Sequence, residues 1–175
     1  MPLRLAPMLE TIEQETGPYP RRSVIWLHGL GADGHDFAPI VPQLLRADWP
    51  PIRFVFPHAP VRPVTINAGM RMRAWYDING FDLAQRQDEA GIRASMAQVE
   101  ALIEREAQRG VAARDVILAG FSQGGAIALA AGLRHAQALA GIIALSTYLP
   151  IAQIVAAERN AAGASVPVFM AHGAF

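Results

Sequence analysis

The feature that most constrains the fold is a series of short apolar runs that alternate with helical patterns along the chain. The runs are rich in β-branched residues, are bounded by Gly or Pro, and occupy residues 24–27, 52–56, 116–119, 141–145 and 166–170. Continuous apolar runs are typical of strands that are covered on both faces, as in a parallel sheet. Strands that alternate with helices predict an α/β fold, in which helices sandwich a mainly parallel sheet.

Three segments between these runs have helical patterns. In residues 88–109 the apolar side chains recur every three or four positions, and Gly110 is a suitable stop; the recurring residues are Ile92, Met96, Val99 and Ile103. Residues 124–133 are rich in Ala, Leu and Ile, which predicts a helix buried against the sheet. A third helix is expected over residues 152–162, ending near Gly163. Residues 57–87 contain three prolines and predict loops with a short hairpin.

Composition narrows the class of protein. A chain of 175 residues that is 52% hydrophobic and 17% charged predicts one globular domain over residues 1–175. Fifteen basic and fifteen acidic residues balance, which argues against nucleic acid or an anionic membrane as a partner. There is no cysteine, and we see neither a signal peptide nor an apolar run long enough to span a membrane. We therefore expect a soluble cytoplasmic protein, and the sequence leaves a homodimer open.

The motif Gly120-x-Ser122-x-Gly124 lies between an apolar strand and an Ala-rich helix. In this context G-x-S-x-G is typical of a sharp, strained turn that exposes a nucleophilic serine, because side chains at the flanking positions would collide with the backbone. The amide of Gln123, at the start of the helix, can stabilise a developing oxyanion. The alternative is a small-residue turn in which the serine only caps the helix.

A glycine loop follows the first strand, with Gly29, Gly31 and Gly34 in the pattern G-x-G-x-x-G. The pattern also occurs in dinucleotide-binding folds, which need an acidic residue about twenty positions later to hold the ribose. Here that region reads Val-Phe-Pro-His, and two prolines interrupt the segment where the receiving helix should lie. A dinucleotide-binding oxidoreductase is therefore the weakest of the functional alternatives.

The same loop has two further interpretations. A loop of the type His-Gly-x-x after an inner strand can aim a backbone N–H at a substrate carbonyl, and Leu30 would supply that amide. A metal site formed by Asp33, His35 and Asp36 is a weaker interpretation, because Asp and His beside glycine more often form turns. We therefore expect no metal and no organic cofactor.

Six segments in order resemble one known family. They are HGLGADG, RFVFPHAP, AWYD, ILAGFSQGGA, ALSTYLP and VPVFMAHG. Together they resemble the carboxylesterase and acyl-protein thioesterase group of α/β-hydrolases, over about residues 20–175. The resemblance implies an α/β-hydrolase fold and a serine hydrolase that cleaves esters or thioesters of acyl chains through an acyl-enzyme.

The resemblance also implies roles for individual residues. Ser122 would be the nucleophile, and the amides of Leu30 and Gln123 would form the oxyanion hole. Loops around the WYD segment help to form the acyl-binding region in this group, which makes candidates of Trp75, Tyr76 and Met70. Considered without the resemblance, Trp75 and Met70 are typical packing residues.

The partners of Ser122 are harder to place. Beyond it the sequence has one acid, Glu158, and two histidines, His135 and His172. We expect His135 to point away from the serine, Glu158 to lie on a solvated helix face, and His172 to be structural. The resemblance implies that the catalytic aspartate and histidine lie beyond Phe175, together with the last strand and helix of the fold.

Three interpretations of this chain stay open. It is a piece of a longer esterase, or its remainder is a separate chain, or it is a natural short product that binds acyl ligands without turning them over. Without a further strand, residues 166–170 would form an apolar sheet edge that favours aggregation. We therefore expect the 175-residue chain alone to be poorly stable and inactive.

Overall fold

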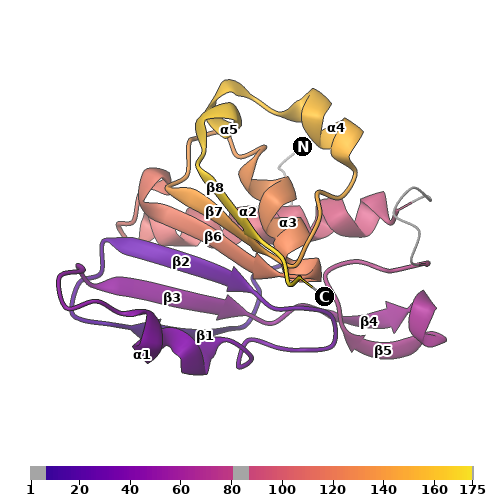
Figure 1. Ribbon diagram of the computed structural model, residues 1–175, viewed down its shortest axis with the longest axis horizontal. Coiled ribbons are helices and arrows are strands. Elements are labelled where there is room, and N and C mark those ends of the chain that lie inside the picture. Colours follow the sequence, from indigo (N-terminus) through magenta and orange to yellow (C-terminus); the bar gives the residue numbers. More distant parts are fainter. Residues whose placement is uncertain (1–6, 81–86, 175) are drawn as a thin grey trace.

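The computed structural model describes residues 7–80 and 87–174, and its centre is a six-stranded sheet with the order β1-β3-β2-β6-β7-β8 (Figure 1). A separate two-stranded hairpin, β4-β5, lies beside the carboxyl ends of the strands (Figure 1). The strands of the large sheet are β1 (Thr11–Glu15), β2 (Arg22–Leu27), β3 (Ile52–Pro57), β6 (Val116–Phe121), β7 (Gly141–Leu145) and β8 (Val168–Ala171). Those of the hairpin are β4 (Val61–Val64) and β5 (Met70–Arg73).

Strand direction brings the functional loops to one edge of the sheet. All neighbouring pairs of the large sheet are parallel except β1 and β3, which are antiparallel. Leu27, the last residue of β2, is level with Gly120 near the end of β6. The loops that follow β2 and β6 therefore begin side by side. The mainly parallel sheet confirms the predicted α/β fold.

Helices cover the two faces of the sheet unequally. The helices are α1 (Val41–Leu44), α2 (Glu89–Gln108), α3 (Gln123–Gly132), α4 (Ala152–Glu158) and α5 (Ala161–Ser165), and 3₁₀ turns occupy Ala38–Ile40, Thr65–Asn67 and Ala113–Asp115. The larger apolar core lies between the sheet and α2 and α3. A smaller core lies on the opposite face, where α1 and its preceding 3₁₀ turn cover Trp26, Phe54 and Phe56.

The two longest helices form where the sequence predicts them. All four recurring apolar side chains of α2 are buried, and the Asp88 carboxylate caps its first turn by accepting from the Gly91 amide at 2.9 Å. Gly110 follows the helix with φ of 89°, a conformation that glycine adopts without strain. Every residue of α3 is buried, as expected for an apolar helix against a sheet.

The predicted third helix is wrong in its extent. Instead of one helix over 152–162, the chain forms α4 and α5, with extended backbone at Arg159 and Asn160 between them. The Asn160 side chain starts α5 by accepting from the Gly163 amide at 2.9 Å. Gly163 does not end a helix but is buried inside α5. It lies so close to Leu133 that a side chain at this position would overlap the Leu133 carbonyl.

Other differences concern the strands. The predicted strand at 166–170 is β8, displaced toward its carboxyl end, and the short hairpin expected within 57–87 is β4-β5. Residues 81–86 of that predicted loop region lie outside the described residues. The sequence analysis did not predict β1, which pairs with β3 through residues 11–15. Among the described residues, no helix has the length and apolar character needed to cross a membrane.

Candidate active site

Ser122 occupies a strained turn between β6 and α3. Its backbone has φ of 52° and ψ of −119°, a region that residues other than glycine rarely adopt. The surroundings hold it there: its amide donates to the Leu145 carbonyl at 2.9 Å, and its carbonyl accepts from the Thr147 hydroxyl at 2.6 Å. The first turn of α3 also bonds to this carbonyl through the Ala126 amide at 3.1 Å. The strained geometry expected from the motif is therefore present.

Three glycines allow the chain to approach itself closely around this serine. A Cβ at Gly120 would overlap the Gly124 carbonyl, and a Cβ at Gly124 would overlap the carbonyls of Leu27 and His28. A Cβ at Gly125 would lie 2.7 Å from Cγ2 of Thr147. Because α3 begins directly against the end of β2, the serine turn and the loop after β2 are in contact.

That loop carries Leu30. Its next residue, Gly31, has φ of 76° and donates its amide to the Arg73 carbonyl at 2.9 Å, which ties the loop to β5. The Leu30 amide donates no hydrogen bond within residues 7–80 and 87–174. The Gln123 amide begins α3, so it belongs to the first N–H groups of a helix, which have no acceptor inside it. Both candidate oxyanion donors are thus backbone amides of fixed segments.

The loop geometry does not favour dinucleotide binding. In residues 7–80 no α-helix begins at the glycine loop itself; the chain passes a 3₁₀ turn before the four-residue α1. A dinucleotide site uses the N-terminus of a helix that follows the glycines directly.

His28 is a structural residue of the same loop. It is 1% exposed, its Nε2 accepts from the Ala59 amide at 3.0 Å, and its Nδ1 lies 2.7 Å from the Gly29 carbonyl oxygen. The Nδ1–H tautomer fits both contacts, so neither ring nitrogen is free to act as a base. Burial lowers the pKa of His28, because the charged imidazolium is poorly solvated there.

The side chain of Gln123 connects the serine turn to the WYD segment. Its Oε1 accepts from the Trp75 amide at 2.7 Å, and its Nε2 donates to the Tyr76 carbonyl at 2.7 Å. The Trp75 indole donates to the His28 carbonyl at 2.8 Å, and the Ser95 hydroxyl donates to the Trp75 carbonyl. These bonds satisfy a buried segment and fix it behind the site. The hydrogen bonds of the Gln123 side chain were not predicted from the sequence, because their partners lie almost fifty residues away along the chain.

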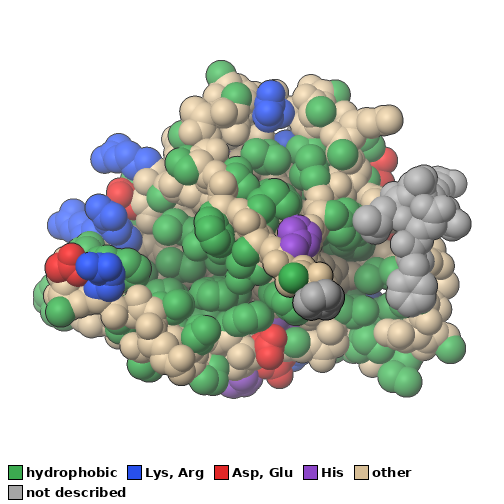
Figure 2. Space-filling view, viewed as in Figure 1, with side chains coloured by type: hydrophobic (Ala, Val, Ile, Leu, Met, Phe, Trp, Pro, Cys, Tyr) green, Lys and Arg blue, Asp and Glu red, His purple; other side chains and the backbone are tan. Residues whose placement is uncertain are grey.

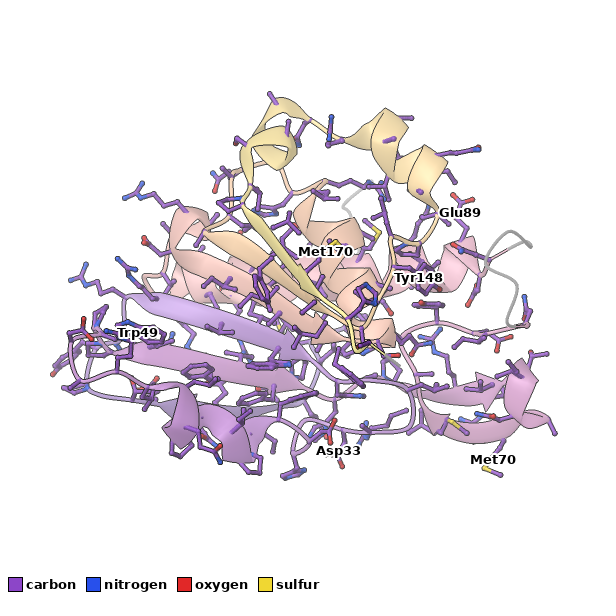
Figure 3. All side chains as sticks on the ribbon, viewed as in Figure 1. Asp33, Trp49, Met70, Glu89, Tyr148 and Met170 are labelled. Atoms are coloured by element: carbon purple, nitrogen blue, oxygen red, sulfur yellow. The ribbon has the colours of Figure 1, made fainter. Side chains whose placement is uncertain are left out.

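The three predicted substrate-binding residues lie in different environments. Trp75 is 0% exposed and Tyr76 is 2% exposed, whereas Met70, at the start of β5, is 64% exposed. Figure 3 shows Met70 at the outer end of the hairpin. Trp75 and Tyr76 are buried and hydrogen-bonded, and contact of any of the three residues with an acyl group stays a prediction.

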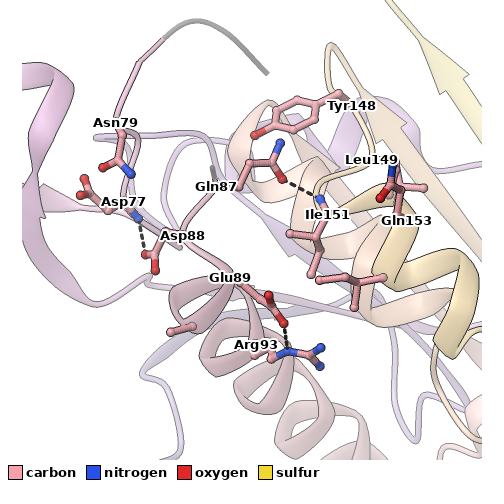
Figure 4. A pocket seen from close by; sticks show the side chains of 13 residues that line it. Asp77, Asn79, Gln87, Asp88, Glu89, Arg93, Tyr148, Leu149, Ile151 and Gln153 are labelled. Carbon is pink, nitrogen blue, oxygen red and sulfur yellow. Dashed lines mark hydrogen bonds and ion pairs between the residues drawn. The ribbon is translucent and has the colours of Figure 1, made fainter. Parts of the chain in front are cut away.

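A cavity of about 1260 Å³ lies near the site (Figure 4). Its wall includes Tyr148, whose hydroxyl is 2.8 Å from that of Tyr76 and whose neighbour Thr147 binds the Ser122 carbonyl. Burial raises the pKa of Tyr76 far above its ordinary value. The lining residues are Asp77, Asn79, Gln87, Asp88, Glu89, Ala90, Arg93, Tyr148, Leu149, Ile151, Ala152, Gln153 and Ile154.

The cavity has a polar side and an apolar side. Two carboxylates on the polar side are occupied: Asp77 accepts from the amide and hydroxyl of Thr65, and Asp88 accepts from the amides of Asp77 and Gly91. Leu149 and Ile151 lie across the cavity from Asp77, next to the polar Gln153, and Ile154 adds further apolar lining (Figure 4). Sequence analysis missed this wall, although ALSTYLP was among the segments of the resemblance.

Among the described residues, none completes a catalytic triad with Ser122. His135 lies 2.7 Å from Glu100 of α2, as expected for a side chain that points away from the serine. Glu158 is exposed, as expected for a solvated helix face, and it also forms ion pairs with Arg93, at 2.8 Å, and with Arg134. His172 follows β8 and is exposed. The Ser122 hydroxyl has no hydrogen bond to another described residue.

The Asp33–His35–Asp36 grouping, considered above as a weaker interpretation of the glycine loop, is not the one that the structure forms. The backbone brings His58, from the loop after β3, to Asp33 and His35, and Asp36 is not part of this group.

A family model described as phospholipase/carboxylesterase matches residues 9–175. The chain belongs to the phospholipase/carboxylesterase family. The expected resemblance is thereby confirmed, and solved structures similar to this chain share the observed fold. The Arabidopsis thaliana protein SOBER1 superimposes with a TM-score of 0.82 at 32% identity, over 87% of this chain and 74% of its own. Acyl-protein thioesterase 2 of Zea mays gives 0.78 at 27% identity, over 94% and 75%.

Curated relatives in the phospholipase/carboxylesterase family are named acyl-protein thioesterase 1. The protein of Neurospora crassa is 43% identical, that of Yarrowia lipolytica 39% and that of Cryptococcus neoformans 37%. Each match covers 86% of this chain. This chain spans 65%, 67% and 64% of these relatives, respectively.

Proposed function

We propose that this protein is a serine hydrolase that cleaves carboxylic esters or thioesters of acyl chains, with Ser122 as the nucleophile. The observation that carries the proposal is the turn at Ser122, which is strained at φ of 52° and lies between a parallel strand and the N-terminus of α3. The names of the acyl-protein thioesterase relatives support the substrate class.

The proposed reaction follows from the fixed groups around the serine. The Ser122 hydroxyl loses its proton to a histidine base and attacks the acyl carbonyl, whose oxygen becomes negatively charged. The amides of Leu30 and Gln123 donate to that oxyanion, and they need no reorganisation because both backbones are held by neighbouring hydrogen bonds. Expulsion of the alcohol or thiol leaves an acyl-enzyme, which water then hydrolyses.

The proposal also names the groups around Ser122. We infer that an aspartate and a histidine beyond Phe175 complete the triad. The acyl chain lies along the apolar wall at Leu149, Ile151 and Ile154, beside the Tyr76–Tyr148 hydrogen bond. Trp75 and Tyr76 hold this wall in place. Met70, at the exposed end of the β4-β5 hairpin, contacts the substrate from outside the cavity. No cofactor or metal takes part in the proposed hydrolysis.

The proposal also includes the wider context of the protein. Residues 1–175 belong to one α/β-hydrolase domain, the protein acts in the cytoplasm on a small acyl ester or thioester, and nucleic acid is not a partner. A homodimer is compatible with this reaction, since the described site uses one copy of the chain.

A fluorophosphonate probe tests the proposal directly, because it forms a covalent adduct only with an activated serine. We expect one adduct on Ser122 of the purified natural protein by intact mass and peptide mapping. We expect Ser122→Ala to lose the adduct and to lower kcat for a thioester substrate by roughly 10⁴- to 10⁶-fold. Ser165→Ala is the matched control, because this exposed hydroxyl bonds only to the Ala162 carbonyl. Acyl binding without an adduct would instead indicate a catalytically silent binding domain.

A further inference from the structure

Two loops bring together three side chains that can bind a metal ion, and one of these loops also carries Leu30. Asp33 and His35 follow β2, and His58 follows β3. One ligand atom from each of the three lies within 4.8 Å of those from the other two. Figure 3 shows Asp33 at the surface, on the loop next to the carboxyl ends of β2 and β3. The three side chains share one small region although His58 is far from the others in sequence.

We propose that Asp33, His35 and His58 bind a divalent transition-metal ion of the zinc class. Two imidazoles and one carboxylate suit Zn²⁺, Co²⁺ or Ni²⁺ better than Mg²⁺ or Ca²⁺, which prefer oxygen ligands alone. Three protein ligands leave at least one coordination position for water. The site is independent of the proposed hydrolase reaction, which uses no metal.

The backbone holds two of the ligands in a suitable arrangement before an ion binds. Asp33 Oδ1 accepts from the His35 amide at 2.7 Å and lies 3.1 Å from His35 Nδ1. Because Asp33 Oδ1 and His35 Nδ1 face one another, an ion can take the place of the proton between them when His35 is the Nε2–H tautomer. Both side chains are then ligands of the same ion.

His58 connects ion binding to the loop. Its Nδ1 accepts from the Gly34 amide at 3.0 Å, and a neutral imidazole has only one nitrogen with a free lone pair. Coordination therefore requires the Gly34 amide to release His58, whichever ring nitrogen binds the ion. Gly34 packs closely against the end of β3, since a Cβ there would lie 2.5 Å from the Phe56 carbonyl oxygen. The release is thus a local change in the loop that also carries Leu30.

Titration of metal into tag-free, EDTA-treated protein tests the site. We expect calorimetry with ZnCl₂ to give one site per chain, and CoCl₂ to give visible absorption bands of a nitrogen- and oxygen-ligated ion. In an amide NMR spectrum Zn²⁺ should shift the Gly34 resonance more than those of distant residues. These readouts measure binding, so they do not depend on whether the protein hydrolyses esters.

Variants of the two exposed ligands complete the test. The side chains of Asp33 and His35 are 45% and 68% exposed, so Asp33→Asn and His35→Ala should fold with an unchanged melting temperature without metal. Each should weaken Zn²⁺ binding by at least about tenfold, and the double variant further. His135→Ala is the control, because it removes a histidine beside a carboxylate elsewhere in the fold. Wild-type affinity in both variants would overturn the proposal. So would the absence of binding to the wild-type protein at about 1 mM Zn²⁺.

Discussion

Small residues around Ser122 determine how closely α3 approaches the sheet. Gly120 and Gly124 have no space for a Cβ, whereas Gly141 at the start of β7 has only one ordinary contact, 3.4 Å from the Pro167 carbonyl oxygen. Glycine is therefore required at the first two positions for steric reasons and at the third for none that the structure shows. The difference separates positions that shape the site from positions that merely tolerate glycine.

Gly124→Ala should be strongly destabilising. The added methyl group would overlap the carbonyls of Leu27 and His28, so α3 must move from the end of β2, at a cost of about 1–3 kcal/mol. Urea unfolding checks the free energy, and the rate of fluorophosphonate labelling checks the site. Gly141→Ala is the matched control and should change the free energy of unfolding by less than about 0.5 kcal/mol. Equal effects of the two substitutions would contradict this explanation.

Buried His28 should make the protein sensitive to mild acid. Its folded pKa lies below the ordinary value of 6.5 because of burial, so between these two values the unfolded chain binds more protons than the folded chain. The contribution of neutral His28 to the free energy of unfolding is fully present above about pH 6.5. It decreases as the pH falls toward the folded pKa, by up to about 1.4 kcal/mol per pH unit. His58 has a pKa shifted in the same direction, by burial and by Arg73.

Urea unfolding between pH 7.5 and 5 measures this dependence. The change in the free energy of unfolding per pH unit should be smaller in His28→Gln than in the wild-type protein. It should be unchanged in His135→Gln, which removes a histidine that lies beside Glu100. A slope that is the same in all three proteins would assign the acid sensitivity to other groups.

At the scale of elements, α4 is a short helix with little buried surface. Val155 is its only buried residue among the described ones, and the helix is flanked by Ile151 in the left-handed region and by extended Arg159. Its last residue, Glu158, pairs with Arg93 of α2 at 2.8 Å and with Arg134 after α3. These ion pairs connect the end of α4 to α2 and to the segment directly after α3, in addition to the packing of Val155 on the larger core.

Glu158→Gln should loosen α4. Loss of the carboxylate removes two ion pairs and leaves Arg93 and Arg134 without their shared partner, a cost of about 1 kcal/mol. Hydrogen exchange should become faster in residues 152–158 and stay unchanged in α2 and β6. Asp48→Asn, which removes a fully solvated pair with Arg46, should leave exchange unaffected. Protected α4 amides in the variant would show that Val155 alone holds the helix.

The elements also show where sequence patterns suffice and where they fail. Helix α2 and strands β2, β3, β6 and β7 are buried along continuous or periodic apolar stretches, so pattern alone locates them. Strand β1, with the sequence TIEQE, has no apolar run, and it is held instead by β3 and by ion pairs of Glu13 to Arg105 and Arg109. The close approach of Gly163 in α5 to Leu133 joins segments that are distant in sequence, so a local pattern cannot predict where α4 ends and α5 begins.

The same distinction applies to the candidate site. The turn at Ser122 could be predicted because it depends on neighbours in sequence, namely the glycines and the strand–helix junction. The hydrogen bonds from Gln123 to Trp75 and Tyr76 join segments almost fifty residues apart, so only the folded chain reveals them. The Asp33–His35–His58 grouping likewise requires β2 and β3 to be neighbours.

On the whole molecule, one face of the sheet is broadly apolar. Figure 2 shows hydrophobic side chains gathered over β6, β7 and β8 on the face that also carries α1. Ile143 is level with Phe169 of β8, and Phe169 is 61% exposed. Among the described residues, no strand pairs with the outer edge of β8. An unpaired edge beside an apolar face favours association with other chains.

The 175-residue chain should therefore self-associate. Light scattering after gel filtration should show a mass that increases with protein concentration, and thermal unfolding should be broad or accompanied by aggregation. Phe169→Lys should reduce the association, because a charge at the edge opposes pairing. Tyr19→Lys is the control, since Tyr19 is also exposed but lies before β2. A monomeric chain with a sharp, reversible transition would show that the edge is harmless.

Gln123 contributes to the proposed site through both its main chain and its side chain. Its amide nitrogen on the main chain faces the proposed oxyanion, while its side chain holds Trp75 and Tyr76 in place. A substitution of Gln123 by any residue except proline removes the side-chain bonds to Trp75 and Tyr76 but keeps the main-chain N–H. Position 123 therefore offers a way to change how the WYD segment is held, and with it the shape of the site, while the proposed oxyanion donor is retained.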